Sequence, residues 1–163
     1  MIKKVLLALG LVFLVIQAFR PKKNNSDHHP YPLTASYEVP ADVESILARA
    51  CNDCHSNSTR YPWYAEVQPV AWWLAQHVNE GKGHLNLSEF STGRIYRQFH
   101  KFEEIVETVR DGSMPLPSYT WLGLHADARL SADDQQTLIT WAENQMTLLR
   151  NTYPADSLQR QQR

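Results

Sequence analysis

Two cysteines and a histidine stand together in the run Cys51-Asn52-Asp53-Cys54-His55. Two thiols two residues apart match the spacing of the two vinyl groups of haem, to which cysteines add as thioethers. The histidine that follows directly is placed to bind the iron as its proximal ligand. These are the only two cysteines of the chain, so haem would consume both. The pattern therefore predicts one covalently attached haem c per chain, held by Cys51 and Cys54, with His55 on the iron.

A cysteine pair also occurs in redox dithiols and in zinc sites. A thioredoxin-like pair needs a strand–helix–strand setting, and no run rich in Val and Ile precedes Cys51. A structural zinc site needs four ligands, typically from two paired clusters. The chain has no second cysteine pair, although its seven histidines leave a site of two cysteines and two histidines open.

The second chemical feature is Met114, which is followed by Pro115 and stands in a short loop. A rigid loop suits a thioether that must meet iron at a fixed distance, and a methionine ligand raises the reduction potential. We predict Met114 as the distal iron ligand, with a packed loop methionine as the alternative. His77 is an alternative distal residue, because it shares a helix face with Trp73. A hydrogen-bonded core histidine is the ordinary interpretation of His77.

The residues after the cysteine pattern suggest contacts to the haem propionates. Arg60 and Trp63 carry donors for such contacts, and arginine suits carboxylates geometrically. A surface arginine beside packed aromatic rings is the alternative. The other ring N–H of His55 needs an acceptor that fixes the tautomer. We expect this acceptor to be a backbone carbonyl near Pro62 or Pro69.

Apolar periodicity predicts an all-α fold that positions these residues. A helix over 41–51 places Val43, Ile46, Leu47 and Ala50 on one face and runs directly into the cysteine pattern. We expect a helical stretch over 63–80, interrupted near Pro69 and ended by Gly81-Lys82-Gly83. A third helix is expected over 100–110. Ser131 and Asp134 form a capping box for the last helix.

The chain divides into four parts. Residues 1–20 carry two lysines and then an apolar run, as a signal peptide or N-terminal membrane anchor does. Residues 21–40 are polar and rich in proline, and we expect a tether there. Residues 41–150 form the cytochrome c-like haem domain, and residues 151–163 a polar tail. Export would place the domain on the periplasmic side of a bacterial inner membrane.

The order of helix, cysteine pattern, Met-Pro loop and final helix resembles small monohaem cytochromes c of the all-helical class. The runs Cys51–Ser56, Thr59–Tyr64, Trp72-Trp73, Leu85–Ser88 and Met114-Pro115 resemble the bacterial haem-binding domain family. The resemblance covers roughly Val39 to Leu149. It implies an exported, often membrane-tethered, c-type haem protein and supplies no reaction.

Two functions follow from these predictions. With both axial positions filled, the protein would carry single electrons between periplasmic or membrane redox proteins and would not be an enzyme. The alternative is a gas sensor or peroxidase-like enzyme with an open sixth position, but peroxide activation needs a cationic group beside the distal base. No arginine stands near His77 in the sequence. The formal net charge of −1 gives no basic surface for nucleic acid.

Overall fold

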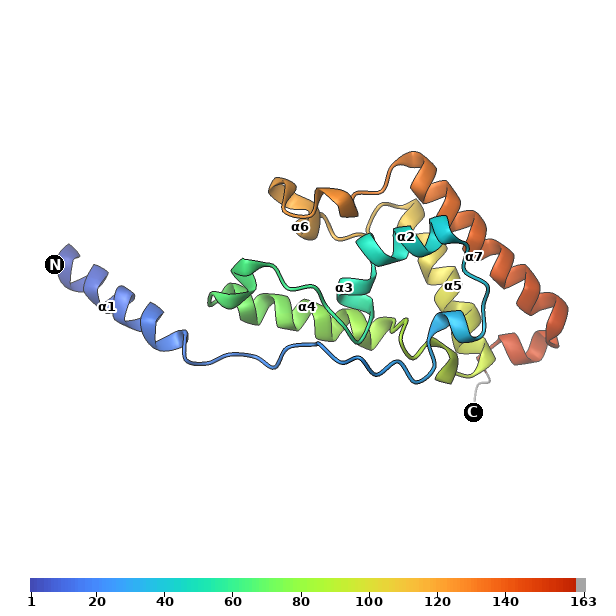
Figure 1. Cartoon of the computed structure of the whole chain (residues 1–163), viewed down its shortest axis with the longest axis horizontal. Helices are drawn as coiled ribbons and strands as arrows, with labels where there is room; N and C mark the ends of the chain where they lie inside the picture. Colours follow the sequence, from blue (N-terminus) through green and yellow to red (C-terminus); the bar gives the residue numbers. More distant parts are fainter. Residues whose placement is uncertain (161–163) are drawn as a thin grey trace.

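The structure is a computed structural model that describes residues 1–160. Within these residues it contains seven α-helices joined by short 3-10 turns, and its only β feature is an isolated bridge between Asn25 and Ser58 (Figure 1). The all-α class expected from the apolar periodicity is confirmed.

Three helices form the core: α2 (Ala41–Ala50), α5 (Ile95–Arg110) and α7 (Ala132–Thr152). Helices α5 and α7 pack along one another, and α2 packs on α7 (Figure 1). Phe102 of α5 is fully buried between the ring edges of Tyr37 and Trp141, whose centroids lie 4.9 and 5.6 Å away. Arg49 of α2 pairs with Asp134 at 2.6 Å, which ties α2 to the start of α7.

The capping box predicted for the last helix is confirmed. The Ser131 hydroxyl accepts a hydrogen bond from the backbone N–H of Asp134 at 3.1 Å. The Asp134 carboxylate in turn accepts from the backbone N–H of Ser131 at 2.9 Å. These two bonds satisfy N–H groups that the first turn of a helix leaves without partners.

The cysteine pattern folds as a separate helical turn, α3 (Asn52–His55), directly after α2. It packs against α4 (Val70–His84), the helix that follows the 3-10 turn Trp63–Glu66. The predicted interruption near Pro69 is confirmed, since α4 begins immediately after that residue. Residues 63–66 form a 3-10 turn, where we had expected the first part of a helical stretch.

The expectation that Gly81-Lys82-Gly83 ends this helix is wrong, because α4 continues to His84. Gly81 serves a different purpose. A Cβ atom at position 81 would lie 2.8 Å from the carbonyl oxygen of Cys54, closer than real Cβ atoms approach. The missing side chain therefore lets α4 pack directly on the backbone of α3.

A long connection between α5 and α7 holds the Met114 loop. It turns at Gly112, whose φ of +73° suits glycine. The short helix α6 (Pro117–Thr120) and the 3-10 turns Trp121–Gly123 and Ala126–Ala128 follow. We refer to residues 116–128 as the groove loop, because side chains from it line a groove beside α4.

The N-terminal helix α1 (Ile2–Ile16) projects from the rest of the molecule (Figure 1). None of its residues is buried. No helix within residues 1–160 has both the length and the apolar character needed to cross a membrane.

The segment 21–40 differs from the expected tether, because it contributes to the core. Leu33 and Tyr37 are 3% and 6% exposed, and both belong to the main apolar cluster. Their apolar side chains stand among prolines and polar residues, so no periodic pattern marked them as buried. In the predicted polar tail, the 3-10 turn Ala155–Leu158 packs on α5 and α7, and residues 161–163 lie outside the described residues.

Candidate haem site

His55 is held in one tautomer by the end of α4. Its Nδ1 atom lies 2.9 Å from the carbonyl oxygen of Gly81 and 3.0 Å from that of Leu85. Because carbonyl oxygens only accept, Nδ1 carries the hydrogen and Nε2 keeps its lone pair. Burial lowers the pKa of His55, so the ring is neutral near pH 7. The side chain is thus prepared to bind a metal through Nε2.

The acceptor for His55 lies elsewhere than expected. It consists of two carbonyls at the end of α4, and no carbonyl near Pro62 or Pro69 takes part. The Gly81 carbonyl stands in the last turn of α4 and accepts from both Nδ1 and the backbone N–H of Leu85, the latter at 2.8 Å. Leu85 directly follows the helix, and its own carbonyl is the second acceptor.

The two cysteines are free thiols. Burial raises the pKa of Cys51 to about 12 and that of Cys54 to about 11. A reactive dithiol shows the opposite shift, toward a stable thiolate near neutral pH. Within residues 1–160, no three His, Cys, Asp or Glu side chains gather into a metal site. The redox-dithiol and zinc interpretations therefore gain no support.

A groove opens beside Cys54, between α4 and the groove loop. Its cavity volume is about 40 Å³, far below the roughly 300–1,000 Å³ that ligand pockets occupy, so it is a narrow groove between packed side chains. Trp73, Leu74, His77 and Val78 line it from α4, and Leu116, Tyr119 and His125 line it from the opposite side. The chemistry of this donor set, two neighbouring thiols and a neutral imidazole with a free Nε2, fits a covalently held haem.

The structure brings only some of the predicted iron ligands to this groove. His77 lines it, and its Nδ1 lies 2.9 Å from the carbonyl oxygen of Trp73 on the same helix, which leaves Nε2 free. His55 and Met114 are not among the lining residues. Met114 is half-buried, and its N–H donates to the Thr108 carbonyl at 3.0 Å. Its role as distal ligand stays a prediction.

The two residues predicted to contact propionates differ in placement. Arg60 lines the groove, but its guanidinium is paired with Asp53, with Nη2 3.2 Å from Oδ2. This pairing raises the pKa of Arg60 further. Trp63 is 79% exposed and is not among the lining residues. Propionate contacts by either residue stay predictions.

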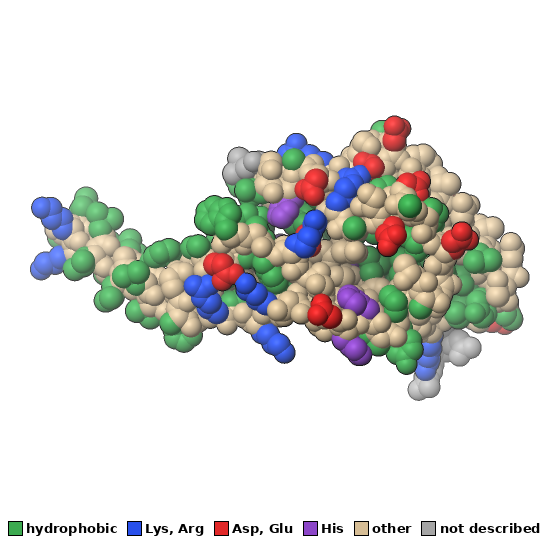
Figure 2. All heavy atoms as spheres, viewed as in Figure 1, with side chains coloured by type: hydrophobic (Ala, Val, Ile, Leu, Met, Phe, Trp, Pro, Cys, Tyr) green, Lys and Arg blue, Asp and Glu red, His purple; other side chains and the backbone are tan. Residues whose placement is uncertain are grey.

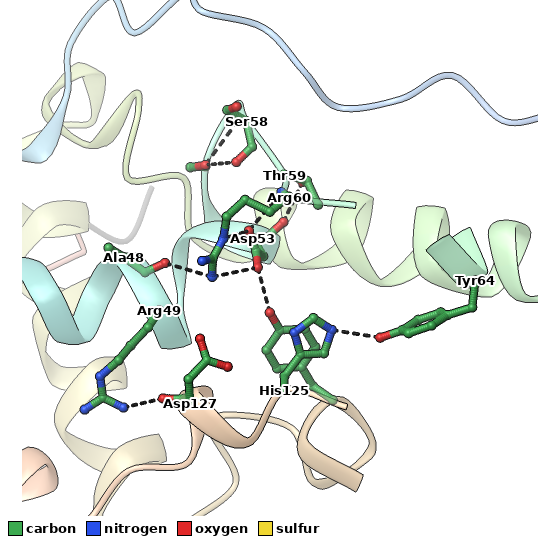
Figure 3. A network of polar contacts seen from close by, with 11 residues as sticks. Ala48, Arg49, Asp53, Ser58, Thr59, Arg60, Tyr64, His125 and Asp127 are labelled. Carbon is green, nitrogen blue, oxygen red and sulfur yellow. Dashed lines mark hydrogen bonds and ion pairs between the residues drawn. The ribbon is translucent and has the colours of Figure 1, made fainter. Parts of the chain in front are cut away.

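Asp53, one of the two residues between the cysteines, is a site residue that the sequence pattern alone does not reveal. Its side chain is 8% exposed and accepts from three donors besides the guanidinium Nη2 (Figure 3). These are the backbone N–H of Arg60 at 2.9 Å, Arg60 Nε at 3.3 Å and the Tyr119 hydroxyl at 2.7 Å. Charge-assisted bonds of this kind offset the burial of a carboxylate.

The network continues from Asp53 across the groove loop. Tyr119 stacks on the ring of His125, with centroids 4.1 Å apart and planes 13° from parallel. His125 Nε2 lies 2.8 Å from the Tyr64 hydroxyl (Figure 3). Burial, followed by the bond to Asp53, raises the pKa of Tyr119. Helix α3, which carries the cysteine pattern, is thus connected to the groove loop by the hydrogen bond between Asp53 and Tyr119.

Comparison with protein families gives one finding. A family model described as the haem-binding domain matches residues 11–144, which include the cysteine pattern, α4 and the groove loop. No curated protein and no solved structure matches the chain. Since the family model covers most of the chain, haem is its cofactor, and the protein belongs to the haem-binding domain family.

Proposed function

We propose that the chain is an exported monohaem c-type protein that carries single electrons. One haem c is attached through Cys51 and Cys54, with His55 as the proximal ligand and Met114 as the distal one. The domain works on the periplasmic side of a bacterial inner membrane, where its partners are other redox proteins. When bound, the haem iron supplies the one-electron couple.

The observation that carries this proposal is the tautomer of His55. The carbonyls of Gly81 and Leu85 fix the hydrogen on Nδ1, and they leave Nε2 free in the residue directly after the second cysteine. Hydrogen bonding at Nδ1 also raises the basicity of a ligating imidazole. The remaining groups play supporting roles: α4 and the groove loop provide apolar walls that keep water away.

Covalent attachment is tested on protein produced in a periplasm with a cytochrome c maturation system. Acidified organic solvent should fail to extract the haem, and the intact mass should equal chain plus one haem. A variant with both Cys51→Ala and Cys54→Ala should release any bound haem to the solvent. Haem that extracts fully from the wild-type chain would refute covalent attachment.

The electron-transfer role is tested by adding carbon monoxide to the reduced protein. An unchanged spectrum is expected, because two protein ligands would hold the iron. A large and fast shift would instead indicate an open sixth position. The gas-sensor or peroxidase-like function would then be favoured, and the groove residue His77 would be the first target for substitution.

A further inference from the structure

Gln68 connects the start of the chain to the haem domain. Its side chain is among the few that are fully buried, at 1% exposed for the residue. The side-chain Nε2 donates to the carbonyl of Phe19 at 2.6 Å. Its backbone N–H donates to Gln17 Oε1 at 3.0 Å, and its carbonyl accepts from Gln17 Nε2 at 3.3 Å. Gln68 therefore forms a two-way amide pair with the residue that follows α1.

Trp72, in the first turn of α4, completes this contact. The indole N–H of Trp72 donates to the Phe19 carbonyl at 2.9 Å, so that one oxygen accepts from two side chains. The backbone N–H of Trp72 donates to Gln68 Oε1 at 3.2 Å. A buried amide that loses such partners is left with unsatisfied polar atoms. This set of hydrogen bonds around Gln68 is complete only when residues 17–19 are present.

The contact extends along the chain beyond Phe19. Arg20 pairs with Glu66 at 2.8 Å, and Lys23 pairs with the same carboxylate. Asn24 Nδ2 then donates to the Ser56 carbonyl and to the Thr59 hydroxyl, both at 2.9 Å. Residues 17–24 are therefore docked on the elements that frame the haem site. The family match, which begins at residue 11, includes this docked segment.

Helix α1 carries apolar side chains on all faces and buries none of them. Such a helix is stable only in an apolar surrounding. Three basic residues, Arg20, Lys22 and Lys23, stand in the docked segment after α1. Trp63 and Trp72 belong to the elements that this segment contacts, and they are 79% and 41% exposed. Figure 2 shows apolar side chains over α1 and basic ones gathered where it joins the domain. Tryptophan and basic residues together are typical of a membrane–water interface.

We propose that the residues 17–23 and 63–72, here called the junction, seat the domain on an anionic lipid bilayer with α1 inserted among the acyl chains. The Gln17–Gln68 pair keeps α1 on the mature protein and fixes its direction. This inference rests on the proposed export of the domain. At 15 residues α1 is about 22 Å long, so the proposal requires insertion and not a full crossing of the ~30 Å core.

The test uses the full-length, haem-loaded protein and vesicles of phosphatidylethanolamine and phosphatidylglycerol. The intact mass should include residues 1–20, and the protein should float with the vesicles. Brominated acyl chains should quench the tryptophan fluorescence, and a Trp63→Phe, Trp72→Phe variant should lose at least half of that quenching. A mature chain that begins beyond Phe19, or quenching that the double variant retains, would overturn the proposal.

Gln17→Leu tests the pair itself, because both bonds join the side-chain amide of Gln17 to the backbone of Gln68. Gln76→Leu is its control. Gln76 is exposed on α4 and bonds only to Glu80 among the side chains. Gln17→Leu should still float through α1, but its quenching should fall at least twofold while Gln76→Leu matches the wild type. Equal quenching in the two variants would refute the role of the pair. Should Gln17→Leu fail to fold, the mass and quenching of the wild type still decide the proposal.

The outcomes separate this inference from the proposed function. A protein that keeps α1, floats and loses its quenching in the Trp63→Phe, Trp72→Phe variant, but carries extractable haem, would support the junction and refute covalent attachment. A protein with covalent haem whose chain begins beyond Phe19 would refute the junction and support covalent attachment.

Discussion

Replacing Gly81 by alanine should separate α3, the turn that carries the cysteine pattern, from α4. The new Cβ would lie 2.8 Å from the Cys54 carbonyl oxygen and 3.1 Å from Cys54 Cβ. The nearest atom belongs to the backbone, so it cannot rotate away. Either α3 or α4 must shift by several tenths of an ångström, which would also move the Gly81 carbonyl that orients His55.

The expected size follows from comparison with Gly83, two residues further along the same helix. Alanine in place of glycine stabilises a helix interior by about 0.5–1 kcal/mol. A Cβ at position 83 meets nothing within 4 Å, so Gly83→Ala should show this gain. Gly81→Ala has the same gain but adds overpacking, which costs about 1–3 kcal/mol. The two variants should therefore differ by about 1–3 kcal/mol, or ~2–12 °C in Tm.

The assay is thermal and urea unfolding of both variants beside the wild type, with covalent haem content measured on the same preparations. Gly81→Ala should be less stable than Gly83→Ala and should carry less covalent haem. If Gly81→Ala were as stable as Gly83→Ala, α4 would not pack on the Cys54 carbonyl, and the argument for the His55 tautomer would fail with it.

Three further predictions concern the fold, the network and the iron. The pKa of Asp134 is lowered to about 2, chiefly by the hydrogen bond from its arginine partner, so its stabilisation is present above about pH 4 and is lost as the pH falls through 2. In urea unfolding, Asp134→Asn should be about 1–2 kcal/mol less stable at pH 7 and should approach the wild type near pH 2. Tyr119→Phe removes a donor to Asp53 and should cost about 1–2 kcal/mol and speed hydrogen exchange in the groove loop, whereas Tyr31→Phe, at an exposed ring, should change neither. Met114→Ala should abolish the thioether-to-iron charge-transfer band, and an unchanged spectrum would remove Met114 from the iron.

Local patterns predicted the helices well, because the information lies within a few residues. The stripe over 41–51, the break at Pro69 and the Ser131 capping box all depend on neighbours in sequence. The glycines at 81 and 83 show where this approach fails. A glycine that ends a helix and one that admits a neighbouring backbone look alike in sequence, and only tertiary packing distinguishes them.

The site was only partly predictable for the same reason. The cysteine pattern by itself predicts a haem site, but the partners that orient its side chains are far away along the chain. His55 bonds to residues 26 and 30 positions later, and Asp53 bonds to one 66 positions later. Carbonyl acceptors leave no trace in the sequence, since every residue has one. The only local sign for Asp53 was an arginine seven residues downstream.

Helix α4 joins these observations. Gln68, just before the helix, and Trp72, in its first turn, receive the chain from α1. The middle of the helix lines the groove with His77, and its last turn orients His55. The helix is unbroken from Val70 to His84, so a tilt of its first turn would be carried to its last turn. A tilt imposed where the chain leaves the lipid would therefore displace the Gly81 carbonyl. Because that carbonyl is bonded to Nδ1 of His55, seating on the bilayer would be physically coupled to the iron if His55 is its ligand, as proposed.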